Sequence, residues 1–182
     1  NHIYSKEMEH DACGVGLIES TEGKKSRAVV EYGIEALKAV WHRGAVDADG
    51  KTGDGAGIHV EIPKDFFIEK IEVTGHDYDN SEICVGMIFL PRNDYSAQES
   101  CKTIVESELT KNNFSIYGWR QVPVNPKVLG EKAFQTMPEI IQVLFKSNDQ
   151  NLLDKNLERK IYETRKKIEN KAFNLSLNNF YV

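Results

Sequence analysis

The sequence predicts one mixed domain, or one piece of a larger domain, in which strands and helices share a hydrophobic core. Its 182 residues fall within the usual size of a domain, and hydrophobic residues, at 40%, suffice for such a core. Short apolar runs typical of strands alternate along the chain with segments whose apolar residues recur at helical spacing. This alternation alone does not distinguish an α+β fold from a layered α/β fold.

The first third of the chain is predicted to contain a helix between two strands. The strands comprise residues 13–19, interrupted by glycine near the start, and residues 58–62, whose apolar side chains alternate with polar ones. The helix is expected to begin after Ser26, a suitable N-cap, and to end at Gly44. Its predicted inner face comprises Val30, Ile34, Leu37 and Trp41.

The remainder is predicted to contain three apolar strands and two helices. The strands comprise residues 82–91, 114–124 and 138–147, and the helices residues 96–112 and 152–173. The inner faces of these helices comprise Cys101, Ile104, Val105 and Leu109 in the first, and Leu157, Ile161, Thr164 and Ile168 in the second.

Residues 173–182 are predicted to begin one further strand. An apolar strand that is left unpaired at the edge of a sheet promotes aggregation. We therefore expect the 182 residues to be a truncated domain.

Charge and cysteine content exclude several classes of protein. The net charge of −5 argues against a nucleic-acid partner, and no apolar run approaches the roughly 20 residues of a membrane span. The polar first dozen residues do not resemble a secretory signal.

Three widely separated cysteines indicate a reducing compartment, the cytoplasm or an organelle stroma such as that of a plastid. Cys84 and Cys101 are expected to pack in the core, and no cysteine or histidine spacing predicts a metal site.

Three local motifs, "ACGVG", "HRGAVDAD" and "KTGDGAG", are weak when taken singly. The glycine-rich run 53–57 lacks the spacing of a phosphate-binding loop and precedes a predicted strand rather than a helix. Arg43 could simply neutralise the dipole at the end of a helix. Asp47, Asp49 and Asp54 could be solvated loop residues or oxygen ligands of a cation, although their spacing is not that of an EF-hand.

Together and in this order, these motifs are much more specific. The stretch "CGVGLIE", followed by a helix that leads into "HRGAVDADGKTGDGAGIHVEIPKDFF", resembles the opening of the glutamate synthase large chain. That opening is a class II glutamine amidotransferase domain of the N-terminal-nucleophile hydrolase type. The resemblance continues through "VGMIFLPR", "GWRQVPV", "LG", "PEIIQVLF" and "LERKIYETRKKIE", and so covers nearly all of the chain from Cys13 onward. It implies an α+β fold, a four-layer sandwich of two mostly antiparallel sheets between helices, incomplete in this fragment.

The resemblance also implies the site residues. Cys13 would be the nucleophile, and Arg43, in the family's His-Arg-Gly stretch, would lie beside it and help to bind glutamine. Residues 1–12 would form a propeptide-like leader, and residues 13–182 the N-terminal part of a glutamine amidotransferase type 2 domain. No metal ligand is implied.

The chemistry of Cys13 explains why a leader would have to be removed. Amide hydrolysis needs a nucleophile and a base, and the family uses the α-amino group of the nucleophile as that base. A free α-amine titrates at roughly 7.7–8.0 and a cysteine thiol near about 8.5. Inside the peptide bond between Ala12 and Cys13 the nitrogen lone pair is delocalised and accepts no proton. Cleavage at that bond would therefore create the catalyst.

Part of the family's machinery has no counterpart in the sequence. The oxyanion hole of these enzymes uses an Asn-Gly dipeptide, and no asparagine here is followed by glycine. Loss of one oxyanion donor typically lowers the rate about 100- to 1000-fold. The resemblance thus implies that this fragment alone has no useful glutaminase activity.

The function implied is the glutaminase part of glutamate synthase, which releases ammonia from L-glutamine for the amination of 2-oxoglutarate. The flavin mononucleotide (FMN) and iron–sulfur cluster of such enzymes would belong to later domains, with no cofactor in this segment. Expected partners are the downstream synthase domains and an electron-donating small subunit, with neither nucleic acid nor membrane. Two alternatives remain: another class II amidotransferase, or an inactive truncated interaction module.

Overall fold

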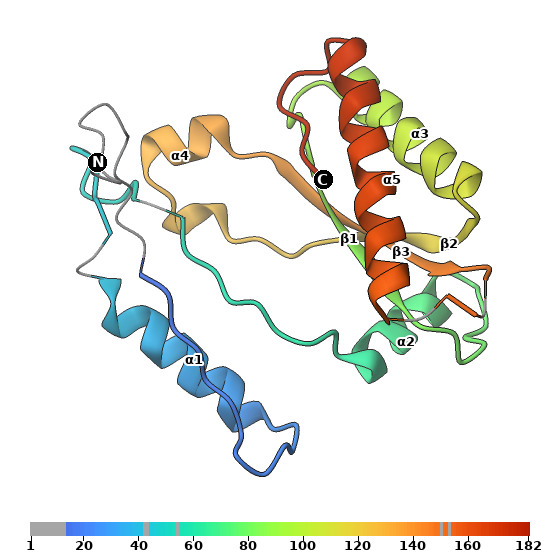
Figure 1. The fold of residues 1–182 in the computed structure, drawn as a ribbon. Coiled ribbons are helices and arrows are strands. Elements are labelled where there is room, and N and C mark those ends of the chain that lie inside the picture. Colours follow the sequence, from blue (N-terminus) through green and yellow to red (C-terminus); the bar gives the residue numbers. More distant parts are fainter. Residues whose placement is uncertain (1–13, 42–43, 54, 150, 153) are drawn as a thin grey trace, which may run out of the picture. The chain divides into compact units, whose positions relative to one another are not determined.

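The structure is a computed structural model that describes residues 14–41, 44–53, 55–149, 151–152 and 154–182 (Figure 1). The chain divides into two compact units. The first comprises Asn1–Glu61 and Asn125–Gln135, and the second comprises Ile62–Val124 and Thr136–Val182. Each unit is described by itself below.

The first unit contains helix α1 (Arg27–Ala39), the single-turn helix η2 (Pro126–Val128) and most of the short helix α4 (Glu131–Thr136). The predicted N-cap of α1 is confirmed, because the Ser26 hydroxyl accepts a hydrogen bond from the Val29 amide at 3.4 Å. The predicted end at Gly44 is wrong. The helix ends at Ala39, and Trp41, which was expected on its inner face, is 71% exposed.

Both strands predicted in this part of the chain are wrong as well. Residues 14–20 and 55–62 are irregular, and Val15 and Leu17 are 95% and 83% exposed. A strand is stable only when a neighbour pairs with its backbone and covers its apolar face. Within the described part of the first unit, no neighbouring strand supplies such pairing to either segment.

The second unit is built on a three-stranded antiparallel sheet of order β1-β3-β2. Its strands are β1 (Cys84–Leu90), β2 (Phe114–Gln121) and β3 (Glu139–Ser147), which confirms the three apolar strands predicted from the sequence with slightly narrower bounds. This arrangement is of the α+β type, with helices packed on an antiparallel sheet.

Helices α3 (Tyr95–Lys111) and α5 (Asp154–Asn174) cover one face of the sheet. The predicted inner positions of both helices are confirmed, because all but Ile161 are buried and Ile161 packs against the same cluster. The shared core cluster includes Ile88 and Leu90 of β1, Val105 of α3, Val143 of β3 and Ile168 of α5.

The other face of the sheet is covered by α2 (Lys64–Val73), a helix that the sequence analysis did not predict. Phe67 and Ile71 of α2 pack against Tyr117 and Leu144. Because successive side chains of a strand point to opposite faces, Leu144 faces α2 while its neighbours in β3 face α3 and α5.

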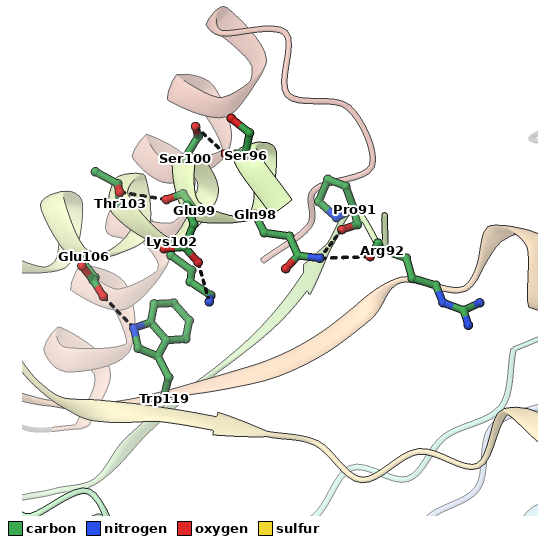
Figure 2. Close-up of polar contacts among 10 residues, drawn as sticks. All are labelled: Pro91, Arg92, Ser96, Gln98, Glu99, Ser100, Lys102, Thr103, Glu106 and Trp119. Carbon is green, nitrogen blue, oxygen red and sulfur yellow. Dashed lines mark hydrogen bonds and ion pairs between the residues drawn. The ribbon is translucent and has the colours of Figure 1, made fainter. Parts of the chain in front are cut away.

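Polar contacts fix α3 on the sheet (Figure 2). The Asp94 carboxylate caps the helix by accepting a hydrogen bond from the Ala97 amide at 2.9 Å. The buried Gln98 amide donates to the carbonyl oxygen of Pro91 at 2.7 Å, which ties the helix to the segment after β1. On a later turn of α3, the Glu106 carboxylate accepts a hydrogen bond from Nε1 of Trp119 in β2 at 2.7 Å.

A bulge in β2 places a buried tyrosine among polar partners. Tyr117 is the extra residue between two register positions opposite β3, and its hydroxyl donates to the Asp79 carboxylate at 2.9 Å. Lys146 forms an ion pair with the same carboxylate. The next residue, Gly118, has φ of +154°, and a Cβ there would lie 2.7 Å from Thr74 Cγ2, so this position requires glycine.

Candidate functional site

The two residues that the sequence analysis placed at the catalytic centre, Cys13 and Arg43, lie outside the described residues, as does Asp54. The structure does describe the segments next to them. Gly14 follows the predicted nucleophile directly, and residues 44–53 follow Arg43 directly. The geometry of residues 44–53 is therefore the structural information nearest to the predicted site.

Residues 45–53 form a small hairpin. Val46 and Gly53 make an antiparallel bridge, and the Asp47 amide donates to the Thr52 carbonyl oxygen at 2.7 Å. At the tip, the Gly50 amide donates to the Asp47 carbonyl oxygen at 2.9 Å, and Gly50 has φ of +69°. This left-handed backbone favours glycine at the turn.

The carboxylate of Asp49 holds the tip of this hairpin together. Its Oδ1 accepts hydrogen bonds from the amides of Lys51 at 2.9 Å and Thr52 at 2.7 Å. Its Oδ2 accepts the Thr52 hydroxyl at 2.5 Å and also the amide of Glu131 at 3.0 Å. Hydrogen bonds to the charged form, first of all that from the Thr52 side chain, hold the pKa of Asp49 well below its ordinary value.

The bond from Glu131 joins the hairpin to the first residue of α4, far along the chain. Gly130 lies so close to the hairpin that a Cβ there would collide with Asp49 Oδ2, Thr52 Oγ1 and the Thr52 amide nitrogen. A second link is the ion pair between Lys132 and Asp47, whose atoms are 2.6 Å apart. The hairpin and the start of α4 are thus one locked element of the first unit.

The contacts of Asp47 and Asp49 show a structural role for both side chains. Both carboxylates are engaged with protein donors and hold the hairpin on α4. Among the described residues, no group of three or more His, Cys, Asp or Glu side chains could hold a metal ion. The contacts with Glu131 and Lys132 give these two aspartates a structural role in the loop that follows Arg43.

The two described cysteines are poor nucleophiles. Cys84 and Cys101 are buried in the core between the sheet and the helices, as the sequence predicted. Burial raises the pKa of the Cys84 thiol to about 12 and also raises that of Cys101. A thiol with a raised pKa holds very little of the reactive thiolate at neutral pH.

The sequence analysis missed the role of Gly130. The dipeptide Leu129-Gly130 was noted only as part of a pattern, and its contact with Asp49 joins segments that no local signal connects. The available signal was a glycine directly before a short helix, opposite a loop rich in aspartate. This signal becomes informative only once the fold is known.

Among the described residues, no helix is long and apolar enough to cross a membrane. The polar cluster of Tyr117, Asp79 and Lys146 lies in the second unit and joins the bulge of β2 to the loop that precedes β1. Neither observation adds a residue to the candidate site.

Comparison with known proteins gives a consistent result. A family model described as glutamine amidotransferases class-II matches residues 13–182. The chain is 52% identical over 181 residues to the "Glutamate synthase [NADPH] large chain" of Azospirillum brasilense, covering 100% of this chain and 12% of that relative. It is 40% identical over 168 residues to the "Ferredoxin-dependent glutamate synthase" of Pyropia yezoensis, covering 92% of this chain and 11% of the relative. A chloroplastic/mitochondrial ferredoxin-dependent glutamate synthase of Arabidopsis thaliana is 40% identical over 162 residues, covering 88% of this chain and 10% of its own length. The chain therefore spans about one eighth or less of the length of these relatives.

Proposed function

This chain belongs to the class-II glutamine amidotransferases, and we propose that it is the opening part of the glutamine-hydrolysing domain of a glutamate synthase large chain. The observation that carries the proposal is the 52% identity over essentially the whole chain to a glutamate synthase large chain. The family match begins at Cys13, the residue that the sequence motif selects as nucleophile.

In the proposed reaction, the Cys13 thiol attacks the side-chain amide carbon of glutamine. The α-amino group of Cys13 takes the thiol proton and later gives a proton to the departing nitrogen. Ammonia leaves, a thioester between the sulfur and the glutamyl carbonyl remains, and water hydrolyses it to glutamate and the free thiol. Every bond is formed or broken by the side chain, the amine, the substrate and water, so this half-reaction needs no cofactor.

Residues 1–12 are proposed to be a leader whose removal frees the α-amine of Cys13. The alignment with the Azospirillum relative extends over 181 residues, so it includes nearly all of this segment. The similarity to this relative therefore extends to both sides of the bond between Ala12 and Cys13. Residues 13–182 then form the N-terminal part of the amidotransferase domain.

Arg43 is proposed to help bind glutamine, since the planar fork of an arginine suits a carboxylate. The hairpin that follows it is supported by Asp49, Thr52 and Glu131. A substrate-binding side chain acts well only when its backbone is held in place. The lock between the hairpin and α4 would supply such support four to nine residues beyond Arg43.

The complete domain is proposed to be a four-layer sandwich of two sheets between helices. The antiparallel sheet of the second unit, with α3 and α5 on one face, would form one sheet and one helical layer. The exposed apolar side chains of the first unit would find their partners in the second sheet. They include Val15, Leu17, Ile58 and Val60.

The remaining functions of the parent enzyme are proposed to reside in other domains. Ammonia would pass to a synthase domain that aminates 2-oxoglutarate, with FMN and an iron–sulfur cluster as its redox groups. Cys84 and Cys101 pack in the apolar core and are not proposed as ligands of that cluster. An electron-donating small subunit is a further proposed partner. The proposed location is a reducing compartment, the cytoplasm or a plastid stroma.

Two other functions compete with this one. A different class II amidotransferase would join the same domain to another synthase, and the identity of the following domain decides between them. An interaction module without activity would keep residues 1–12 and would not react with glutamine analogues.

The test uses the full-length protein that carries this chain. Its intact mass should lack residues 1–12, and the purified protein should hydrolyse glutamine. A diazo-ketone analogue of glutamine should alkylate one thiol, located at Cys13 by peptide mapping. Retention of the leader, or labelling of Cys84 or Cys101 instead, would contradict the proposal.

A further inference from the structure

The tip of the hairpin contains an aspartate that is followed directly by glycine, Asp49-Gly50, and both residues are exposed. This dipeptide is chemically special, because glycine has no side chain that would hinder the approach of the aspartate carboxyl carbon to the next amide nitrogen. When these two atoms join, they close a succinimide ring. The proposed hydrolysis of glutamine does not involve this peptide bond.

The ring forms with loss of water. The amide nitrogen of Gly50 forms a bond to Cγ of Asp49 and releases its proton, and a carboxyl oxygen leaves as water once the carboxyl group is protonated. Water then opens the ring at either carbonyl carbon. Attack at Cγ restores aspartate, whereas attack at the backbone carbonyl carbon gives isoaspartate, whose main chain runs through the side-chain carbons. The net change is an isomerisation, so it needs no reagent besides water.

In the closed hairpin, the carboxylate of Asp49 is held back from this reaction. Each oxygen accepts two hydrogen bonds, Oδ1 from the amides of Lys51 and Thr52 and Oδ2 from the Thr52 hydroxyl and the Glu131 amide. Whichever oxygen leaves as water, two of these bonds must break first. The same bonds, first of all that from the Thr52 side chain, lower the pKa of Asp49 and so withhold the proton that the departing oxygen requires.

The amide nitrogen of Gly50 is engaged as well. It donates to the Asp47 carbonyl oxygen at 2.9 Å, in a turn where Gly50 has φ of +69°. Ring closure requires this nitrogen to lose its proton and to bond to Cγ of Asp49, so its hydrogen bond to Asp47 must break too. Both reacting groups therefore become available only when the tip of the hairpin opens.

Contacts with the start of α4 oppose this opening. Gly130 packs directly against the Asp49 carboxylate and the Thr52 hydroxyl, and the Glu131 amide donates to Asp49 Oδ2 at 3.0 Å. Opening the tip thus requires the hairpin to separate from α4. When a site reacts only in a transiently opened state, its rate follows the population of that state. The contact with α4 therefore controls how fast Asp49 reacts.

We propose that Asp49-Gly50 is a site of isoaspartate formation, which the contacts with Thr52 and Glu131 hold unreactive and which reacts when the hairpin separates from α4. The product cannot rebuild the closed hairpin. In isoaspartate the main chain gains a carbon atom and the free carboxylate is attached directly to Cα, so it no longer meets the same four donors. The modification converts a reversible opening into a lasting one.

Oxygen incorporation in the full-length protein tests the proposal. In water labelled with a heavy oxygen isotope, each ring opening places a heavy oxygen at Asp49, which peptide mapping locates, and a synthetic isoaspartyl peptide identifies the isomer. We expect incorporation at Asp49 to be at least about 10-fold slower in the native protein than in the protein unfolded by urea. In the unfolded protein Asp54-Gly55, the same dipeptide, should react about as fast as Asp49-Gly50 and serves as the chemical reference. Cys13→Ala should give the same rates as the parent, because the reaction is independent of the proposed catalysis.

Variants of the hairpin contacts provide a second readout. Gly130→Ala should speed incorporation at Asp49 in the folded protein about 10-fold, because the added methyl group must displace the carboxylate or the Thr52 side chain. Thr52→Val, which removes the hydroxyl donor and keeps the amide, should act in the same direction. Gly33→Ala is the matched control and should leave the rate unchanged, since a Cβ at Gly33 meets no atom within 4 Å.

Two results would overturn the proposal. Equal rates at Asp49 in the native and the unfolded protein would show that the closed hairpin gives no protection. Folded Gly130→Ala and Thr52→Val proteins that both react no faster than the parent would show that the protection does not come from the contacts with α4 and Thr52.

Discussion

Gly130 and Asp49 lie in direct contact, and this contact fixes the hairpin that follows Arg43 to the start of α4. A Cβ on Gly130 would collide with Asp49 Oδ2, and the amide of Glu131 donates to the same oxygen at 3.0 Å. The hairpin is therefore held by a segment that is distant from it in the sequence.

Replacing Asp49 by asparagine should lower glutaminase activity without touching the reacting atoms. Asparagine has one acceptor oxygen, so Asp49→Asn cannot accept the Thr52 hydroxyl, the Glu131 amide and the two hairpin amides together. We expect kcat/KM for glutamine in the full-length protein to fall about 10- to 100-fold, as for a loosened site. Lys51→Ala, which retains its backbone amide, is the matched control and should stay near the parent value. Equal activity of Asp49→Asn and the parent would show that the hairpin does not support the site.

Substitution of Gly130 by alanine should loosen the same element. The added methyl group must displace the Asp49 carboxylate or the Thr52 side chain, at a cost of about 1–3 kcal/mol in the free energy of unfolding. Hydrogen exchange of the Lys51 and Thr52 amides measures the effect locally and should become faster.

Gly33→Ala is the control for that experiment. Gly33 lies within α1, and a Cβ there meets no atom within 4 Å. Alanine at this position should leave stability unchanged or raise it by about 0.4–1 kcal/mol, since it favours the helix. If Gly130→Ala proved as harmless as Gly33→Ala, the close contact with Asp49 would be refuted.

Asp79 should make the second unit sensitive to acid. The ion pair with Lys146, assisted by Ser81 and Tyr117, holds the pKa of Asp79 well below its ordinary value in the folded state. A carboxylate with a lowered folded pKa contributes stability above its unfolded pKa of about 3.9, and this contribution is lost as pH falls through the folded value. Because the group is close to solvent, the contribution is about 1 kcal/mol or less.

The measurement is the free energy of unfolding of the parent protein and of Asp79→Asn as a function of pH. The difference between them should be constant from pH 7 down to about pH 5 and should shrink below about pH 4. Lys146→Met should reduce the same pH-dependent component. A difference that grows on acidification would have the opposite sign and would exclude a lowered pKa.

Thiol reactivity should separate Cys13 from the other cysteines. Burial raises the pKa of Cys84 to about 12, so its thiolate is scarce at neutral pH, and Cys101 is also buried with a raised pKa. In the native full-length protein, we expect the glutamine analogue to modify Cys13 and to leave both buried thiols intact. Denaturant should then expose Cys84 and Cys101 to a general alkylating reagent. Modification of either one in the native state would argue against this distribution of reactivity.

The sheet of the second unit could be predicted from local sequence, because its strands are continuous apolar runs and its two long helices carry clear apolar stripes. Helix α2 could not, since within its ten charged and apolar residues only Phe67 and Ile71 are buried. The irregular segments 14–20 and 55–62 have strand-like patterns, but pattern alone does not provide a neighbouring strand.

The candidate site was predictable only in part for the same reason. The motif around Cys13 and Arg43 could be identified from residue types in order, and the family match that begins at Cys13 agrees with it. The lock formed by Asp49, Thr52 and Glu131 depends on a contact between distant segments, and no periodicity or spacing encodes it. Sequence motifs therefore suggest the chemistry, whereas the lock on the hairpin after Arg43 could be found only in the structure.

The central proposal is that the sulfur and the free α-amine of Cys13 act together. Its most direct test compares glutamine hydrolysis by two forms of the full-length protein, one that begins at Cys13 and one that retains residues 1–12, each verified by intact mass, with Cys13→Ala as the blank. The form that begins at Cys13 should hydrolyse glutamine, and the form with residues 1–12 should fall to the level of the blank. Equal rates for the two forms would contradict the account, because an amide nitrogen cannot serve as the base.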